Sequence, residues 1–231
     1  MSQEVRSEAL IAVLTELTAS DIEFVLVGGY AVSQYETRFS TDLDLVIAPD
    51  DHEAMVAFLE EHDFERVNRF DVPPEETRYG RAVELFERSR GLSHPVGVDL
   101  LVNGLGCRQT EAEWSFDYLR THSSETTISG GTASTTAQTV DGAVLVAAKL
   151  HSARRTDLVD VLAAVPDVDF DQVESHLYRG DEDALRSQIS EALAFIEGGG
   201  LDHRFKSMFG RSGVTVEDKE ELINFLRGQL R

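Results

Sequence analysis

Two aspartates separated by one residue lie within an apolar stretch of the N-terminal half. In the segment TDLDLVIA, polar and apolar residues alternate as in a β-strand, so Asp42 and Asp44 project from one face. Their Cα atoms are then about 6.5 Å apart, and carboxylates that close repel each other unless a cation neutralises them. Oxygen ligands at this spacing suit Mg²⁺ or Mn²⁺. The pair therefore predicts a divalent-metal site.

A third carboxylate belongs to another predicted strand, VGVDLLV. In this strand, Asp99 lies on the face opposite to Val96, Val98, Leu100 and Val102. If this strand is a neighbour of the one that carries Asp42 and Asp44, Asp99 lies beside that pair. Three carboxylates can hold two metal ions, one acting on an attacking hydroxyl and one on a triphosphate and its leaving pyrophosphate. We expect Asp42, Asp44 and Asp99 to form the metal and catalytic centre.

A glycine pair ends the apolar run FVLVG, where a strand would pass into a short helix. Without side chains, Gly28 and Gly29 let backbone N–H groups approach phosphate oxygens, and the helix dipole favours an anion. Alone, such a pair is typical of a tight turn. Followed after twelve residues by the strand-borne aspartate pair, it predicts a nucleotide site.

Two other interpretations of the aspartate pair remain open. Acidic proteins often carry two aspartates at a solvated strand end with no ligand. A glycosyltransferase that binds a sugar nucleotide through a metal also uses an Asp-x-Asp motif. That reading accounts for Asp42 and Asp44 but leaves the glycine pair and Lys149 without a role.

Lys149 lies among apolar residues in VLVAAKLHSARRTDLVDVL, in a chain whose only other lysines are Lys206 and Lys219. Its ammonium suits triphosphate oxygens, and Asp157 could orient it or complete the site. The alternative is a lysine reaching the surface from a helix, with Asp157 as an ordinary carboxylate near a helix N-terminus.

The stretch VLVGGYAVSQYETRFSTDLDLVI closely resembles the nucleotide-binding motif of nucleotidyltransferases of the polymerase-β-like superfamily. It is most similar to the toxin-like AbiEii class and its bacterial and archaeal relatives, in which GG(Y/A)A precedes R-x-x-T-D-hydrophobic-D. The resemblance extends to Arg38 and Thr41 and implies that both bind the nucleotide. It covers about residues 8–102 and 140–165.

A downstream segment, KLHSARRTDLVDV, looks like the K-L-x-A-x-R-x-K-D-x-x-D-hydrophobic segment of the same group. It aligns Lys149, Arg154, Asp157 and Asp160 with the family pattern. Ser152 stands where alanine is usual, and Thr156 stands where lysine is usual. The resemblance implies that Lys149 and Asp157 belong to the active site and that Lys149 also contacts the nucleotide.

The implied activity is transfer of a nucleoside monophosphate from an NTP to an acceptor, with Mg²⁺ or Mn²⁺ bound and pyrophosphate released. In the family resembled, acceptors are tRNA ends, partner proteins and small molecules, and some members belong to toxin–antitoxin systems. A different class of function is a non-catalytic, antitoxin-like binding module that keeps the nucleotidyltransferase fold and neutralises its partner by contact.

The composition is strongly acidic, with 42 Asp and Glu against 21 Lys and Arg among 231 residues. Abundant carboxylates with few lysines are typical of a halophilic protein, because a salty cytoplasm screens their repulsion. An acidic chain cannot collect a polynucleotide on a broad basic surface, so a few arginines and metal ions would have to hold it. A single cysteine and scattered histidines indicate neither a disulfide nor structural zinc.

The start MSQEVRSEAL is charged, and no apolar run reaches the length of about 18 residues that indicates a membrane span. We therefore expect neither a membrane span nor a secretory leader, and a cytoplasmic protein.

Hydrophobic periodicity predicts an α/β (α+β) fold with a mixed sheet, followed by a helical C-terminal region. A helix near 10–17 precedes a strand at 24–28, and the strand at 41–48 should be its neighbour. Asp50 and Glu53 resemble a capping box for a helix reaching about 61. Further strands are expected at 64–67, 79–88 and 96–102.

We expect a catalytic core at residues 1–102 and, at 103–231, a connecting segment with helices that complete the active site. The Ser/Thr/Gly-rich segment 122–138 predicts a loop or a small β excursion. Helices are predicted near 142–155, 157–165, 171–178, 182–197 and 216–229, the last with Thr215 as N-cap.

Overall fold

The computed structural model describes residues 3–73, 76–78, 80–209 and 215–231. The chain divides into two compact units. Unit 1 comprises residues 1–105 and 114–141, and unit 2 comprises residues 106–113 and 142–231. Each unit is described by itself.

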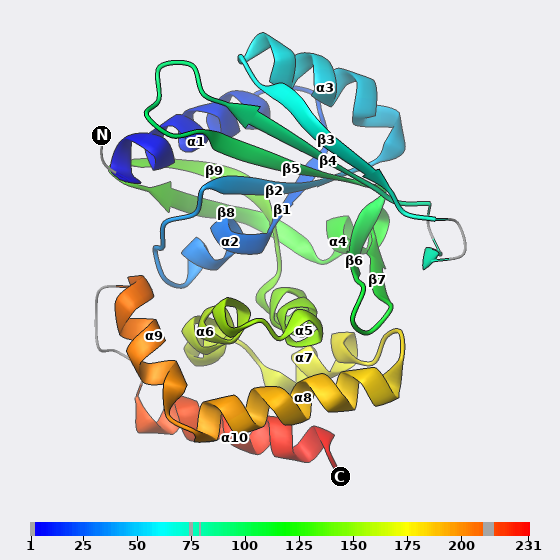
Figure 1. Ribbon diagram of the computed structural model, residues 1–231, viewed down its shortest axis with the longest axis vertical. Helices are drawn as coiled ribbons and strands as arrows, with labels where there is room; N and C mark the ends of the chain where they lie inside the picture. Colours follow the sequence, from blue (N-terminus) through cyan, green and yellow to red (C-terminus); the bar gives the residue numbers. More distant parts are fainter. Residues whose placement is uncertain (1–2, 74–75, 79, 210–214) are drawn as a thin grey trace. The chain divides into compact units, whose positions relative to one another are not determined.

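Unit 1 is built on a seven-stranded mixed sheet with the order β3-β4-β5-β2-β1-β9-β8 (Figure 1). The pairs β2–β5 and β1–β9 are parallel, and the other pairs are antiparallel. The strands are β1 Phe24–Val27, β2 Asp42–Ile47, β3 Glu65–Asp71, β4 Ala82–Arg88, β5 Val96–Val102, β8 Ser123–Gly130 and β9 Ala133–Val140.

The apolar core of unit 1 lies between one face of this sheet and two helices. Helix α1 (Gln3–Thr18) and helix α3 (His52–Glu61) both contribute buried side chains to it. From the sheet come alternate residues of the central strands, including Leu43, Leu45 and Ile47 of β2 and Val96, Val98 and Leu100 of β5. The aspartates between them must therefore point to the opposite face.

Short elements connect the strands of unit 1. Helix α2 (Gly28–Ala31) and the 3₁₀ turn η1 (Val32–Gln34) follow β1, and helix α4 (Phe116–Thr121) precedes β8. The predicted capping box before α3 is wrong. A 3₁₀ turn, η2 (Pro49–Asp51), leads into the helix, so Asp51 is the N-cap and its side chain makes no capping hydrogen bond.

Unit 2 is helical and also contains the turn, at 106–113, of a small hairpin formed by β6 (Gly104–Cys107) and β7 (Ala112–Ser115). Buried His151 contacts this turn within the unit, with Nδ1 2.7 Å from the Thr110 hydroxyl oxygen. The helical elements are α5 Gly142–Ser152, α6 Arg155–Ala164, η4 Val165–Asp167, α7 Phe170–Leu177, α8 Glu182–Glu197, α9 Gly200–Phe209 and α10 Val216–Gln229.

The predicted fold class is confirmed, a mixed α/β core followed by helices, and α8 and α10 have the predicted bounds. Thr215 caps α10 in a full capping box with Asp218. The helix expected at 142–155 ends at Ser152, because Ala153 adopts a φ of 43° and the next helix starts at Arg155. Helix α9, helix α4 and the β6–β7 hairpin were not predicted.

The segment expected to be a loop or small β excursion forms the β8–β9 hairpin of the main sheet, in the same unit as β1–β5. The division into a catalytic core at residues 1–102 and a segment at 103–231 that completes the active site stays a prediction. The strand expected at 79–88 is β4, although Tyr79 lies outside the described residues.

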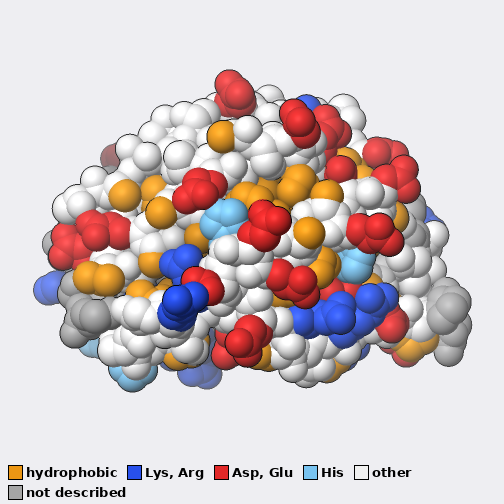
Figure 2. Space-filling model, turned by 90° about the horizontal axis from the view of Figure 1, so that it is seen from above, with side chains coloured by type: hydrophobic (Ala, Val, Ile, Leu, Met, Phe, Trp, Pro, Cys, Tyr) orange, Lys and Arg blue, Asp and Glu red, His pale blue; other side chains and the backbone are white. Residues whose placement is uncertain are grey.

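The surface is acidic, as the composition requires. On the face shown in Figure 2, Asp and Glu side chains are spread widely and basic side chains form small groups, outside the atoms drawn in grey. Within the part of the chain that the structure describes, no helix is both long and apolar enough to cross a membrane.

Candidate active site

Asp42, Asp44 and Asp99 converge on one face of the sheet in unit 1. The parallel register of β2 and β5 places Asp44 directly opposite Asp99 and Asp42 opposite Gly97. One oxygen of each carboxylate lies within 4.8 Å of the others, and all three residues are partly buried. The sequence predicted this convergence, and the register supplies its geometric cause.

The electrostatics of this cluster favour a cation. Burial, and to a smaller extent the negative charge of Asp42, together raise the pKa of the Asp99 carboxyl to about 6. Three carboxylate oxygens this close are the hard ligands that Mg²⁺ and Mn²⁺ prefer. The donor set therefore fits a divalent metal.

The Gly28–Gly29 turn lies against this cluster. Gly28 has a φ of 65°, and a Cβ there would lie 1.9 Å from Oδ2 of Asp44. The Gly29 N–H donates a hydrogen bond of 3.3 Å to that same oxygen. The absent side chain of Gly28 leaves room for the Asp44 carboxylate, so the carboxylate cluster itself requires glycine at this position. That the two glycines also leave room for a phosphate stays a prediction.

Arg38 and Thr41, predicted to bind nucleotide, lie beside the same turn. Arg38 Nε donates to the Gly29 carbonyl oxygen at 3.4 Å. The Thr41 hydroxyl donates to Oδ1 of Asp42 at 2.7 Å. Arg38 therefore contacts the glycine turn, and Thr41 contacts a carboxylate of the cluster.

Sequence reasoning missed Ser40. Its hydroxyl donates to Oδ1 of Asp42 at 3.3 Å. A Cβ on Gly29 would lie 2.8 Å from the Ser40 oxygen and 2.5 Å from Nη2 of Arg38. The run of two hydroxyl residues directly before Asp42 was the available signal. Ser40 and Thr41 together orient the Asp42 carboxylate.

Lys149 and Asp157 come together in unit 2. Lys149 is 7% exposed, and its ammonium donates to Oδ1 of Asp157 at 3.2 Å and to Oδ2 of Asp160 at 2.7 Å. All three residues are buried in the α5–α6 pair. The contact with Asp157 was expected, whereas the shorter one with Asp160 was not. Two of the three N–H groups of this ammonium are thus directed at carboxylates.

Asp157 is also held by residues on the turn between α5 and α6. Arg154 Nε donates to its Oδ2 at 2.6 Å, and the Ser152 hydroxyl donates to the same oxygen. Burial alone would raise the pKa of Asp157, but Lys149, Arg154 and Ser152 together lower it below its usual value. Ser152, which departs from the family pattern, thus has a definite contact here.

The predicted site residues therefore form two groups. The aspartate cluster, the glycine turn, Arg38 and Thr41 belong to unit 1, and Lys149 and Asp157 belong to unit 2.

No protein-family model matches the chain, and no curated protein sequence matches it. Among known structures, it is similar to a protein from H. pylori provisionally assigned as a nucleotidyltransferase, at 15% identity and a TM-score of 0.51, over 100% of this chain and 96% of that one. This likeness shows that the chain has a nucleotidyltransferase fold.

Two further structures score slightly lower. JHP933 from Helicobacter pylori matches at 14% identity and a TM-score of 0.49, over 100% of this chain and 93% of that one. The antibiotic-resistance factor ANT(2'')-Ia matches at 15% identity and a TM-score of 0.49, over 86% of this chain and 96% of that one.

Proposed function

We propose that this chain is a metal-dependent nucleotidyltransferase. It moves a nucleoside monophosphate from an NTP to an acceptor and releases pyrophosphate. One observation carries the proposal: the oxygens of Asp42, Asp44 and Asp99 lie within 4.8 Å of one another in a chain with a nucleotidyltransferase fold. The glycosyltransferase alternative lacks support, because the likeness is to a nucleotidyltransferase fold.

Asp42, Asp44 and Asp99 would hold Mg²⁺ or Mn²⁺. The bound metal would stabilise the negative charge that develops on the triphosphate and on the attacking oxygen. An acceptor oxygen then forms a bond to the α-phosphorus, while the bond between that phosphorus and the bridging oxygen breaks and pyrophosphate leaves with the electron pair. Asp99, which lies beside the first pair of carboxylates, is our candidate to receive the acceptor's proton.

The residues around the cluster orient these carboxylates and the nucleotide. Ser40 and Thr41 hold the Asp42 carboxylate, and the Gly29 N–H holds that of Asp44. Gly28, Gly29, Arg38 and Thr41 are proposed to line the nucleotide phosphates. For Lys149 and Asp157 we propose a positioning role within unit 2, because the ion pairs of Lys149 already use its charge.

The proposed acceptor is a tRNA end, a partner protein or a small molecule, and a place in a toxin–antitoxin system in the cytoplasm follows from the family resemblance. The acidic surface disfavours loose capture of a polynucleotide, although molar salt would weaken this argument. Acceptor choice is proposed to reside in the helical unit, which carries most of the sequence without a family motif.

The test is incubation of the protein in molar KCl, with Mg²⁺ or Mn²⁺, with each NTP radiolabelled at the α-phosphate and with RNA and protein extracts. We expect label to enter one acceptor class with the wild type. The double variant Asp42→Ala/Asp44→Ala should lose at least about a thousandfold of this activity, as when charge-stabilising groups are removed in phosphoryl transfer. Asp63→Asn, at an exposed ion pair of the same unit, is the matched control.

The result also separates the two classes of function. Label in RNA, in protein or in a small molecule identifies the acceptor. If no NTP gives label while nucleotide binding survives, the transferase proposal fails and the antitoxin-like binding module takes its place. That module additionally requires Asp42→Ala to leave neutralisation of its partner intact.

A further inference from the structure

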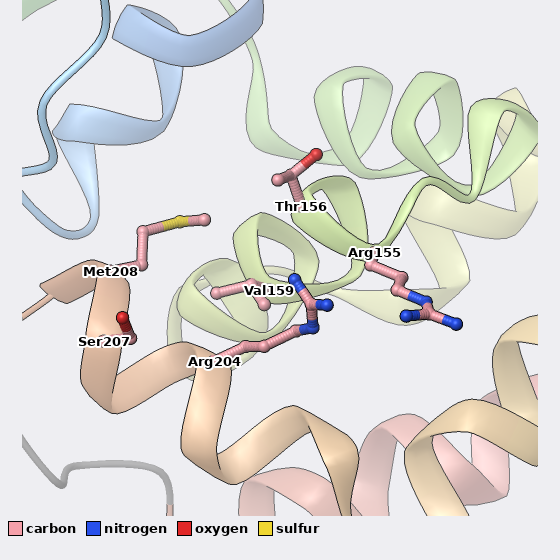
Figure 3. Close-up of a pocket in the computed structure, with 6 residues that line it drawn as sticks. All are labelled: Arg155, Thr156, Val159, Arg204, Ser207 and Met208. Atoms are coloured by element: carbon pink, nitrogen blue, oxygen red, sulfur yellow. The ribbon is translucent and has the colours of Figure 1, made fainter.

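A second site lies entirely within unit 2. Helices α6 and α9 pack against each other and form an open surface pocket of about 180 Å³. Its lining residues are Arg155, Thr156, Val159, Arg204, Ser207 and Met208. In Figure 3, Arg204 and Met208 extend from α9 toward α6, which carries Thr156 and Val159. Neither the aspartate cluster nor the Lys149 cluster (Lys149, Asp157 and Asp160) contributes a lining residue to this pocket.

Several basic residues of the helical unit form ion pairs with carboxylates. Arg154 pairs with Asp157, Lys219 with Asp202 and Arg227 with Glu197. Within the described residues, neither Arg155 nor Arg204 has a carboxylate at ion-pairing distance. In a chain with twice as many acidic as basic residues, two such guanidinium groups lining one pocket create a local positive site.

The remaining lining residues are two exposed hydroxyl residues, Thr156 and Ser207, whose oxygens lie on opposite sides of the pocket in Figure 3, and buried Val159 with Met208, which give an apolar wall. The Arg155 guanidinium lies 5.5 Å from the ring centroid of Phe195, a contact that restricts its orientation. Arginine forks match the geometry of phosphate oxygens.

The size of the pocket limits what it can hold. Sites that enclose a whole small molecule measure roughly 300–1,000 Å³. At about 180 Å³, this open pocket accommodates a phosphate group and the atoms next to it, and the rest of a larger ligand would extend into solvent.

We propose that the Arg155–Arg204 pocket binds a phosphate group of the acceptor substrate. The assignment to the acceptor rests on the proposed function, in which unit 1 residues take the donor nucleotide. The acceptor is then a phosphate-bearing molecule, either a polynucleotide or a phosphorylated small molecule. Two arginines in one pocket supply the local attachment that an acidic polynucleotide-binding protein needs in place of a broad basic surface.

Binding is measured in EDTA, at the lowest KCl concentration that keeps the protein folded, so that no metal and no turnover are involved. The probes are a dye-labelled short RNA, followed by fluorescence anisotropy, and inorganic phosphate and a nucleoside monophosphate, followed by calorimetry. The variants are Arg155→Gln, Arg204→Gln and the double variant. Arg108→Gln removes the same charge from an exposed position on the β6–β7 turn of the same unit and serves as control.

We expect each single variant to weaken binding of at least one probe about tenfold and the double variant about a hundredfold, as for loss of charge-assisted hydrogen bonds. The control should bind like the wild type. Arginine-dependent binding of RNA alone identifies a polynucleotide acceptor, and arginine-dependent binding of the monophosphates identifies a small phosphorylated one.

Two results would overturn the proposal. One is that every probe binds the double variant as tightly as the wild type. The other is that the double variant weakens binding of a non-hydrolysable NTP with Mg²⁺ as strongly as binding of RNA, which would place donor phosphates in the pocket. Failure of the transferase reaction in the labelled-NTP assay leaves these metal-free affinities unchanged, so the two proposals fail separately.

Discussion

Two groups of buried or half-buried aspartates in this molecule show opposite electrostatics. In unit 1, burial and then the negative charge of Asp42 raise the pKa of Asp99 to about 6. In unit 2, burial also raises the pKa of Asp157, but Lys149, Arg154 and Ser152 outweigh it and the pKa is lowered. Burial acts in the same direction on both aspartates, so the neighbouring cations make the difference.

This difference separates a ligand site from a structural ion pair. The Lys149 cluster contains its own positive charge, so its carboxylates need no external partner for stability. The aspartate cluster gathers three carboxylate oxygens within 4.8 Å and gains stability when a cation binds.

Lys149→Met should destabilise the protein by about 3–5 kcal/mol, because it leaves buried Asp157 and Asp160 without their shared ammonium. Lys219→Met breaks an ion pair with the exposed Asp202 and should cost at most about 1 kcal/mol. The measurement is the free energy of unfolding by denaturant. Equal losses in the two variants would contradict the distinction between a buried structural pair and a surface pair.

Asp44→Asn should weaken Mn²⁺ binding more than about a hundredfold, beyond what loss of a residue supporting a metal ligand typically costs. The measurement is calorimetric titration of metal-free protein. Asp63→Asn, at an exposed position whose positive φ an asparagine tolerates, should bind Mn²⁺ like the wild type. If Asp44→Asn retains wild-type affinity, the carboxylate cluster is not the metal site.

Gly28→Ala should destabilise the protein by about 1–2 kcal/mol through its positive φ, and should also reduce Mn²⁺ affinity. The added methyl would lie 1.9 Å from Oδ2 of Asp44, so this carboxylate must move. Gly228→Ala, at a helical position where a Cβ meets nothing within 4 Å, should be neutral or slightly stabilising. Thermal melts and Mn²⁺ titrations on both variants test the contrast.

The pH dependence of stability should have opposite signs in the two groups. Because the folded pKa of Asp99 is raised, its contribution to the stability of metal-free protein is present below the unfolded pKa of about 4 and lost as pH rises through about 6. The contribution of Asp157, whose pKa is lowered, is present above that unfolded value and lost as pH falls through its folded pKa.

Melting curves across this pH range, for the wild type and Asp99→Asn, separate the two terms. Asp99→Asn should abolish the decrease in stability as the pH rises toward 6. It should leave unchanged the loss of stability at low pH, to which Asp157 contributes. Mn²⁺ should restore stability above pH 6 in the wild type only. A decrease of the same size in Asp99→Asn would mean that another group titrates there.

Much of unit 1 followed from local patterns. A strand repeats every two residues, so the alternation in TDLDLVIA was enough to put Asp42 and Asp44 on the face opposite to Leu43, Leu45 and Ile47, as observed. The capping box before α3 failed because Asp50 lies inside a 3₁₀ turn, where another residue becomes the N-cap. The β6–β7 hairpin and α9 lacked patterns strong enough to predict.

Local backbone geometry and the spacing of apolar residues set which side chains share a face, and both can be read from the sequence. Which faces meet depends on contacts between segments that are distant in the chain. The register of β2 against β5 puts Asp44 opposite Asp99, 55 positions later in the chain. Tertiary structure also brings Asp44 against Gly28 and the Lys149 ammonium to Asp157 and Asp160. It also places Arg155 and Arg204 in the lining of one pocket. These contacts join residues whose own segments fold for other reasons, so no local pattern could record them.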